Sequence, residues 1–139
     1  MGTWDVGPFD NDNAADWCGE LQDAEPGQRP AIITGALRQA AGEEGYLECP
    51  EAAEAIAAAA VVAAALPGAE IVNSAYAPNF LSNPAQLELP ATTLALAIAA
   101  LDRIIGEHSE WRDLWVDSDS EPEALAVITS LREHLATAQ

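Results

Sequence analysis

Five stretches of the chain place apolar residues three or four positions apart, which is the spacing of an amphipathic α-helix. The first helix is predicted to begin among residues 10–12, which are all good N-caps, and to continue to about Ala24. Pro26 and Gly27 then end it. One face of this helix carries its apolar residues, which are Ala14, Trp17, Cys18 and Leu21. We expect that face to point into a core.

Two further helices are predicted over residues 30–42 and about 50–66. Pro30 is favoured in the first turn of a helix, and the sequence LPG ends the later one. In the later helix, Glu51 and Glu54 stand near the positive end of the helix dipole, where acidic residues are stabilising. The sequence GEEGYLECP connects the two helices.

A long connector, residues 67–89, follows these helices. It carries three prolines, three asparagines and two aromatic residues, and loops of this length are often functional. Tyr76 lies within it, and two roles fit this residue. It either plugs the helix bundle as part of a structural loop or contributes to a binding site.

The C-terminal part predicts a fourth helix over about residues 90–107 and a last helix that opens at Ser120. Ser120 and Glu123 have the spacing of a capping box. Between the two helices, the sequence HSEWRDLW has two interpretations. It is either a continuation of the fourth helix or a short separate helix capped by Ser109.

Composition supports an all-α fold. Of the 139 residues 50% are apolar, and alanine, the best helix former, dominates them. Residues that favour β-strands are too sparse for the chain to form many strands. We predict a single domain over residues 1–139, a bundle of about five helices with an irregular N-terminal segment and one long loop. The absence of lysine and the abundance of alanine fit a GC-rich bacterial genome, such as that of an actinomycete.

Charge restricts the classes of partner. The formal net charge is −18, and five arginines stand against 23 acidic residues. Such a surface repels nucleic acid and anionic membranes, so we expect neither as a partner. It also favours a soluble monomer or weak homodimer. A basic protein is the partner that this charge would attract.

The compartment is predicted from what the chain lacks. The sequence MGTWDVGPFDND shows no basic start and no apolar run of the kind that a signal peptide has. The apolar run over residues 52–66 is shorter than a membrane span. Two cysteines without a signal suggest free thiols in a reducing environment. We therefore expect a cytoplasmic protein.

The acids at the start of the first helix do not match a calcium-binding loop. Counted from Asp10, an EF-hand requires an oxygen ligand at its fifth position and glutamate at its twelfth, where this chain has Ala14 and Leu21. The two histidines belong to no HExxH or ExxH motif, and no pair of cysteines and histidines has zinc-ligand spacing. We expect no metal site and no cofactor.

Candidate nucleophiles are few. Cys18 lies on the apolar face of the first helix and is predicted to be a small core residue. Cys49 stands just before a predicted helix N-terminus, where its thiolate would be favoured, so a reactive cysteine is an open alternative. No serine motif and no phosphate-binding glycine loop is present. The sequence therefore nominates no enzyme, although it does not exclude one.

Aromatic residues in an alanine-rich bundle supply volume that alanine cannot fill. The tryptophans are therefore expected in the core, with an exposed aromatic interaction site as the alternative. Asp12 and Asp16 are the best binding candidates because they place acidic groups one helical turn apart, and helix capping is their structural alternative. The full set of candidate binding residues is Asp12, Asp16, Trp17, Glu20, Tyr76 and Trp111.

A group of N-terminal positions forms a recognisable motif, which comprises Gly2, Thr3, Trp4, Gly7, Phe9, Asn11, Asp12, Ala14, Asp16 and Trp17. This motif resembles the opening signature of the bacterial domain of unknown function 4259 (DUF4259). The alanine-rich third helix and the segment SEWRDLW also look like that family, so the resemblance spans nearly the whole chain. Asp5 departs from a more usual Gly, and Trp111 from a more usual Leu. The resemblance implies a fold group and no activity.

The preferred function is a non-catalytic binding module, an immunity- or antitoxin-like inhibitor that covers a basic partner surface. It rests on the charge and on the acidic face of the first helix. The alternative is a small enzyme, or a metal- or ligand-binding helical protein. Its site would lie between residues 67–89 and the helix start, and would use Asp12, Asp16 or Cys49.

Overall fold

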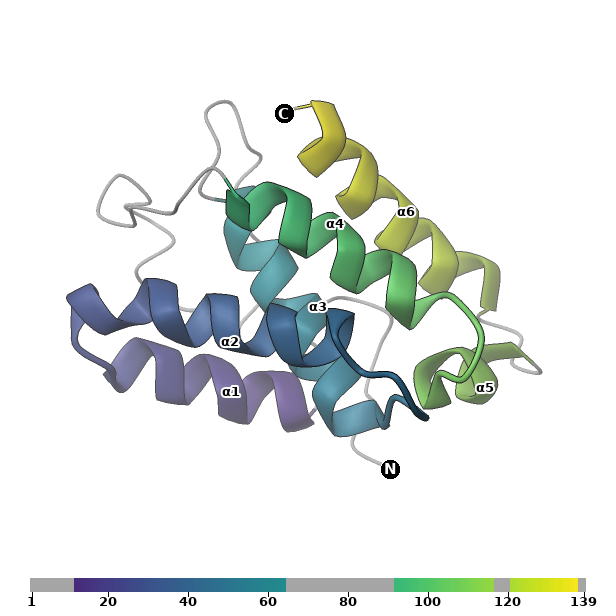
Figure 1. The fold of residues 1–139 in the computed structure, drawn as a ribbon, viewed down its shortest axis with the longest axis horizontal. Helices are drawn as coiled ribbons and strands as arrows, with labels where there is room; N and C mark the ends of the chain where they lie inside the picture. The colour runs from purple at the N-terminus through teal and green to yellow at the C-terminus, as the bar shows by residue number, and fades with distance from the viewer. Residues whose placement is uncertain (1–11, 65–91, 117–120, 138–139) are drawn as a thin grey trace.

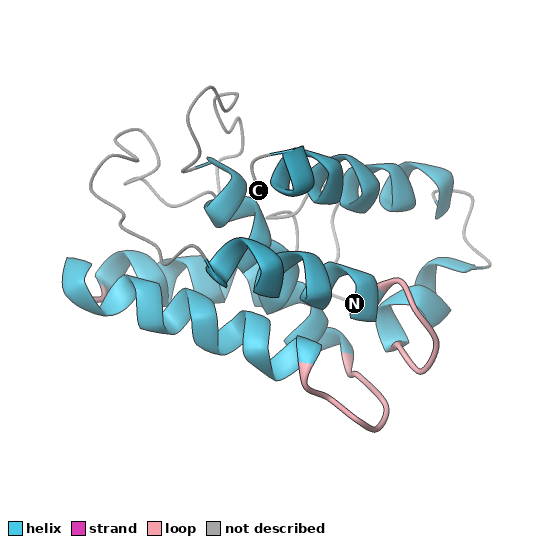
Figure 2. Cartoon of the chain, turned by 45° about the horizontal axis from the view of Figure 1, so that its top comes forward, coloured by secondary structure: helices cyan, strands magenta, loops and turns pink. Residues whose placement is uncertain are grey.

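The computed structural model describes residues 12–64, 92–116 and 121–137. Six α-helices and one 3-10 turn form this part of the chain, and Figures 1 and 2 show no strand within it. In chain order the elements are α1 (Asp12–Asp23), η1 (Pro26–Gln28), α2 (Arg29–Ala41), α3 (Cys49–Ala64), α4 (Thr92–Ile104), α5 (Glu110–Val116) and α6 (Glu121–Thr137). The predicted all-α class is confirmed.

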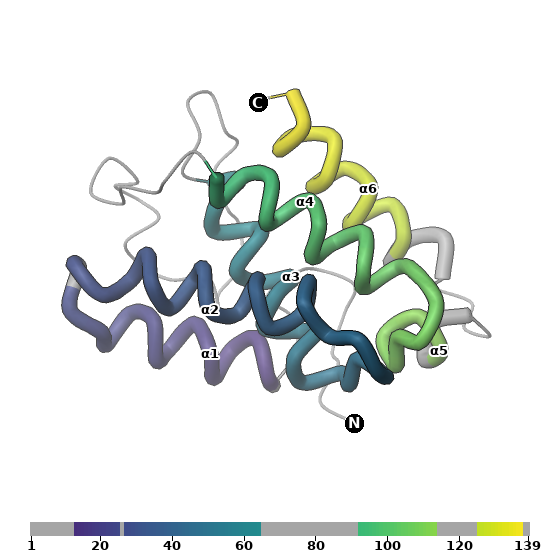
Figure 3. The backbone as a smooth tube through the Cα atoms, in the orientation of Figure 1, coloured from purple at the N-terminus to yellow at the C-terminus, as the bar shows by residue number. Residues whose placement is uncertain are grey.

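Helix α3 is the centre of the structure. It contacts α1, α2, α4, α5 and α6, and the tube in Figure 3 shows it passing behind α2 and α4. All residues from Ala52 to Ala63 except Glu54 are buried, and eight of these eleven are alanines. A helix that is apolar on all sides belongs in the interior of a domain. Alanine side chains are small, so the surrounding helices approach the α3 backbone closely.

The outer helices each turn one face toward α3. Helices α1 and α2 lie side by side in Figure 1, and α4 lies beside α6. Their buried side chains are larger than those of α3, and fill the space between helices. The fully enclosed ones include Leu21, Ile33, Leu37, Leu101 and Ile104, each at 0% exposure. This pairing of large outer residues with small central ones gives a filled core.

The boundaries of α1, α2 and α3 lie within two residues of their predicted positions over the described residues. Helix α4 is shorter than predicted, because it ends at Ile104 and not near residue 107. His108 has a φ of 60°, a left-handed conformation that an α-helix cannot contain. A separate helix, α5, then begins at Glu110. Ser109 caps it, which was one of the two predicted alternatives: its Oγ accepts a hydrogen bond from the Arg112 N–H at 3.4 Å.

Two connectors pack together at one end of the bundle, residues 42–48 between α2 and α3 and residues 105–109 between α4 and α5. We call this the loop junction. The Leu47 N–H donates to the His108 carbonyl at 2.8 Å, and the Glu110 N–H donates to the Leu47 carbonyl at 2.8 Å. Arg103 reaches across both connectors and donates to the carbonyls of Glu43 and Gly45 at 3.0 and 2.6 Å.

The same guanidinium also donates to the carbonyls of Glu107 and His108, at 3.0 and 3.3 Å. Arg103 therefore satisfies acceptors on four residues that belong to no helix. These carbonyls are exposed and water competes for them, so the effect of the guanidinium is to bridge the two connectors. Several predicted features lie outside the described residues: the N-terminal segment, residues 67–89 with Tyr76, and the capping residue Ser120.

Helix α2 offers a first testable prediction at Gly35, an exposed glycine in the middle of the helix. A Cβ added there meets nothing within 4 Å. Gly35→Ala is expected to raise the free energy of unfolding by about 0.5–1 kcal/mol, because glycine in a helix interior loses more backbone entropy than alanine. Urea unfolding measures the change. Gly42→Ala is the control, since its Cβ would lie 3.0 Å from the Arg38 carbonyl oxygen, and an equal gain there would contradict the explanation.

Candidate functional site

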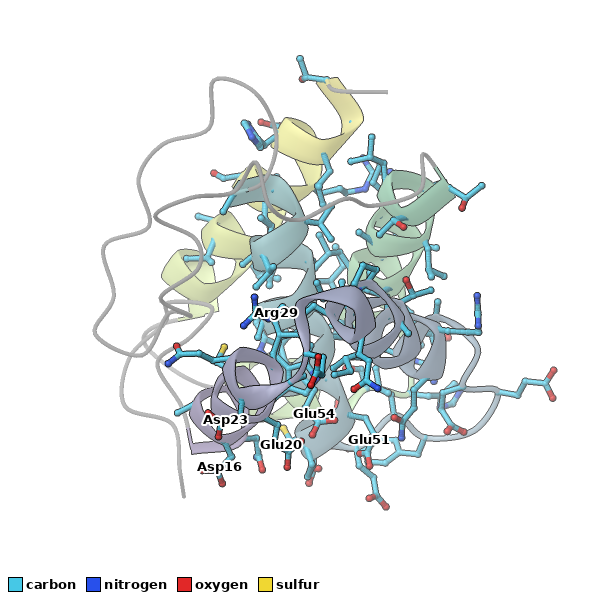
Figure 4. The ribbon with its side chains drawn as sticks, turned by 90° about the vertical axis from the view of Figure 1, so that its left-hand side faces the viewer. Asp16, Glu20, Asp23, Arg29, Glu51 and Glu54 are labelled. Atoms are coloured by element: carbon cyan, nitrogen blue, oxygen red, sulfur yellow. The ribbon has the colours of Figure 1, made fainter. Side chains whose placement is uncertain are left out.

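Acidic side chains gather where α1 lies against α3. Asp16, Glu20 and Asp23 stand at i, i+4 and i+7 on α1, so they share one face of that helix, and all three are exposed. Glu51 and Glu54 stand one turn apart on α3 and are each partly buried. Figure 4 shows the five carboxylates on the same side of the molecule. We call these five residues the acidic face.

Local sequence explains how each helix contributes. Helix α1 buries Trp17, Cys18 and Leu21, which turns the opposite, acidic side toward solvent. In α3, Glu51 lies in the first turn, where the helix dipole favours a negative charge. Glu54 follows one turn later. The contact between α1 and α3 then places Glu20, at the edge of the acidic side of α1, near Glu54.

The pKa of Glu54 reflects both burial and repulsion. Burial raises the pKa of its carboxyl above the ordinary Glu value, and the carboxylates of Glu51 and Glu20 raise it further. Glu51 Oε2 is also buried and has no hydrogen-bond partner among the described residues. A buried acceptor without a donor is uncommon in folded proteins. This part of the acidic face is therefore less stable when it is fully ionised.

Four of the arginines make side-chain contacts at other places in the structure. Arg29 donates to the carbonyls of Leu21 and Gln22 at the C-terminal end of α1, at 3.1 and 2.7 Å. Arg103 binds the loop junction, and Arg112 donates to the Ile105 carbonyl at 2.7 Å. Arg132 forms an ion pair with Asp102 at 2.6 Å, between α6 and α4. None of these contacts involves a carboxylate of the acidic face.

The structure separates the predicted binding residues into distinct environments. Asp16 and Glu20 lie together on the acidic face. Trp17 is 5% exposed and packs in the core, which is the structural role that the sequence favoured for tryptophan. Trp111 is partly buried and packs against the core. Asp12 begins α1, and its side chain lies outside the described residues, as does all of Tyr76.

A second polar cluster lies beside the loop junction, and no pattern in the sequence predicted it. Tyr46 is 49% exposed, and its hydroxyl donates to Asp113 Oδ2 at 2.7 Å. That hydrogen bond and the nearby carboxylates raise the pKa of Tyr46 to about 12. The two residues are 67 positions apart, so no local motif connects them. This pairing of a tyrosine with a carboxylate exists only in the folded chain.

The same cluster changes the expectation for Cys49. The Cys49 N–H donates to Glu110 Oε1 at 2.7 Å, which places a carboxylate at the start of α3. Burial and then this carboxylate raise the pKa of the Cys49 thiol to about 12. The predicted preference for thiolate is therefore wrong, since burial, and then the acid from α5, outweighs the effect of the helix N-terminus. Cys18 is buried as predicted, and burial raises its pKa to about 12.

The described ranges contain neither a cluster of metal ligands nor a helix that could span a membrane. No three or more His, Cys, Asp and Glu side chains there are arranged to hold a metal ion. No helix there has both the length and the apolar character that crossing a bilayer requires. The second half of the alternative site, residues 67–89, lies outside these ranges.

Comparison with known proteins gives one match. A model of the family described as "Domain of unknown function (DUF4259)" matches residues 2–126. No curated protein and no solved structure matches the chain.

Proposed function

Because the chain belongs to the DUF4259 family, whose description names no activity, we propose its function from its own surface: it binds a basic protein through the acidic face. The observation that carries the proposal is the convergence of five carboxylates from α1 and α3, in a chain of net charge −18. Asp16 and Glu20, two of the residues nominated from the sequence, belong to this face. Its chemistry is that of a surface that binds arginine and lysine side chains.

The energetics of the face favour a cationic partner. Like charges three or four residues apart on a helix destabilise it by about 0.2–0.5 kcal/mol per pair. Asp16, Glu20 and Asp23 form such pairs on α1, and Glu51 and Glu54 form one on α3. A basic partner would remove this repulsion on binding, so part of the free energy of association comes from relief of repulsion within the free protein. Charge complementarity would also accelerate the encounter of the two proteins.

A small acidic module of this kind would act as a cover for a basic surface, in the manner of an immunity protein or an antitoxin-like inhibitor. No chemistry at Cys49 is needed for such a role, and the raised thiol pKa is consistent with that. The partner would present arginine or lysine side chains at the spacing of one to two helical turns. Its own activity would be blocked when the two proteins associate.

The test is capture of a partner by the intact chain and by a face variant. The variant Asp16→Asn/Glu20→Gln/Glu54→Gln removes three charges from the acidic face. In lysate of the source organism, at about 0.05 M salt, the wild-type chain is expected to capture a basic protein. Once that protein is purified, the face variant is expected to bind it at least fivefold more weakly, about 1 kcal/mol. Titration at rising salt should weaken the wild-type complex.

A matched control separates the acidic face from net charge. Glu25→Gln/Glu107→Gln/Glu133→Gln removes three charges from exposed positions elsewhere. This control should keep near wild-type affinity, because it leaves the five carboxylates of the face unchanged. Equal weakening in the two triple variants would show that attraction is diffuse and would contradict a defined binding face. Affinity that does not change with salt would also contradict the proposal.

A further inference from the structure

We propose that the contact between α1 and α3 is sensitive to protons, because the carboxyl groups of Glu20 and Glu51 lie near that of Glu54, which takes up a proton as the pH falls. We call these three residues the acidic seam. The inference concerns the free protein and does not depend on the proposed partner. Its consequence is that α1 is held more tightly to α3 in mildly acidic solution than at neutral pH.

The three residues of the acidic seam come from two helices that contact each other, α1 and α3. Glu20 lies on the side of α1 that Figure 4 shows beside Glu54, and Glu51 lies one turn before Glu54 on α3. Glu54 is partly buried between them. Glu51 Oε2 is buried and accepts no hydrogen bond among the described residues. The negative charge of Glu51 therefore lies near Glu54 with one oxygen that accepts no hydrogen bond from the described residues.

Two of the helices that pack against α3 add acidic groups around the seam. On α1, Asp16 and Asp23 share the face of Glu20. On α5, Glu110 and Asp113 add two more carboxylates near the start of α3, where Glu110 accepts from the Cys49 N–H.

The helices packed against α3 also carry basic groups, which are Arg29 and Arg38 on α2, Arg103 on α4, Arg112 on α5, and Arg132 and His134 on α6. Arg29 of α2 donates to the Leu21 and Gln22 carbonyls, and lies apart from Glu54 in Figure 4. Between α4 and α6, Arg132 is paired with Asp102.

The sign of the effect follows from the raised pKa of Glu54. The folded protein binds the proton more tightly than the unfolded chain, whose carboxyl has the ordinary value of 4.5. This contribution to stability is therefore fully present below that ordinary value, and it is lost as the pH rises through the folded-state pKa. Other acids with lowered pKa values would act in the opposite direction, so the seam must be isolated by variants.

The experiment compares thermal midpoints at pH 7 and pH 4 for four proteins of the full chain at one ionic strength. They are the wild type, Glu54→Gln, Glu20→Gln and the control Glu133→Gln, an exposed position on α6. At pH 7, Glu54→Gln is expected to raise Tm by about 2–4 °C, and Glu133→Gln by less than about 1 °C. At pH 4, the gain for Glu54→Gln is expected to disappear, because the wild-type carboxyl is then protonated.

Two further measurements test the coupling itself. Glu20→Gln/Glu54→Gln should gain less than the sum of the single variants, since each removes the same repulsion. Amide protection factors in α1, corrected for the intrinsic exchange rate, should rise from pH 7 to pH 5 in the wild type and change less in Glu54→Gln. Additive gains, or equal effects of Glu54→Gln and Glu133→Gln at both pH values, would overturn the proposal.

Discussion

Replacing Ala58 with leucine is expected to destabilise the protein by about 3 kcal/mol, because the larger side chain has no space in the centre of α3. Ala58 is 0% exposed, and α3 is surrounded by five other helices. The added carbons must displace a neighbouring helix or adopt a strained rotamer. Urea unfolding of Ala58→Leu should therefore show a lower midpoint with a similar slope.

The same substitution at an exposed alanine is the matched control. Ala95 lies on the outer side of α4 and is exposed. Ala95→Leu should change the free energy of unfolding by less than about 0.5 kcal/mol, since leucine and alanine are both good helix formers. If Ala58→Leu were equally neutral, the close approach of helices to α3 would be wrong, and with it the explanation for the alanine content of the chain.

The second large effect is expected at Arg103. Arg103→Met keeps most of the apolar stem and removes the guanidinium that binds four carbonyl groups of the loop junction. We expect a loss of about 2 kcal/mol in the free energy of unfolding, because charge-assisted hydrogen bonds are worth more than neutral ones and water replaces part of them here. Arg103→Lys should restore little of it, since one ammonium cannot reach carbonyls on both connectors.

Arg38 supplies the control for this prediction. It is exposed in the last turn of α2, so Arg38→Met removes the same charge without disturbing the loop junction. Its expected cost is about 0.5 kcal/mol, from the interaction with the helix dipole. Nuclear magnetic resonance of the Leu47 and Glu110 amides would report the junction directly. Unchanged protection of these amides in Arg103→Met would contradict the role assigned to the guanidinium.

We expect substitutions in the acidic face to change the stability of the free protein and its affinity for a basic partner in opposite directions. Substitution of Glu54 should stabilise the free protein and weaken its complex with a basic partner. A residue with a purely structural role would change both in the same direction. A surface kept for binding often carries a cost in stability. Measuring unfolding and binding on the same variants therefore separates a retained binding surface from a general excess of acid.

Some properties of this protein were predictable because they depend on residues close together in the chain. The period of apolar positions and the capping residues predicted α1, α2 and α3, and the burial of Cys18 and Leu21 followed from their spacing. The high alanine content predicted the helical class. Net charge predicted an acidic surface. Each of these depends on local backbone energetics or on composition, which a sequence states directly.

Other properties depend on contacts between residues far apart. Glu51 and Glu54 were interpreted only as favourable charges at a helix start, whereas the contact with α1 places Glu20 beside them. Cys49 was expected to favour thiolate, whereas burial in the folded chain, together with Glu110, which lies 61 residues later, raises its pKa. The C-terminal end of α4 was predicted too late, because the chain turns at His108 to join a connector 60 residues earlier.

The sequence by itself therefore determined the helical class, most helix boundaries in the described part and the sign of the surface charge. Only the tertiary structure decided which carboxylates meet, which thiol is suppressed and where α4 gives way to α5. The physical reason is that electrostatic coupling and hydrogen bonding act through space. They depend on distances that helix packing sets, and no local pattern along the chain encodes those distances.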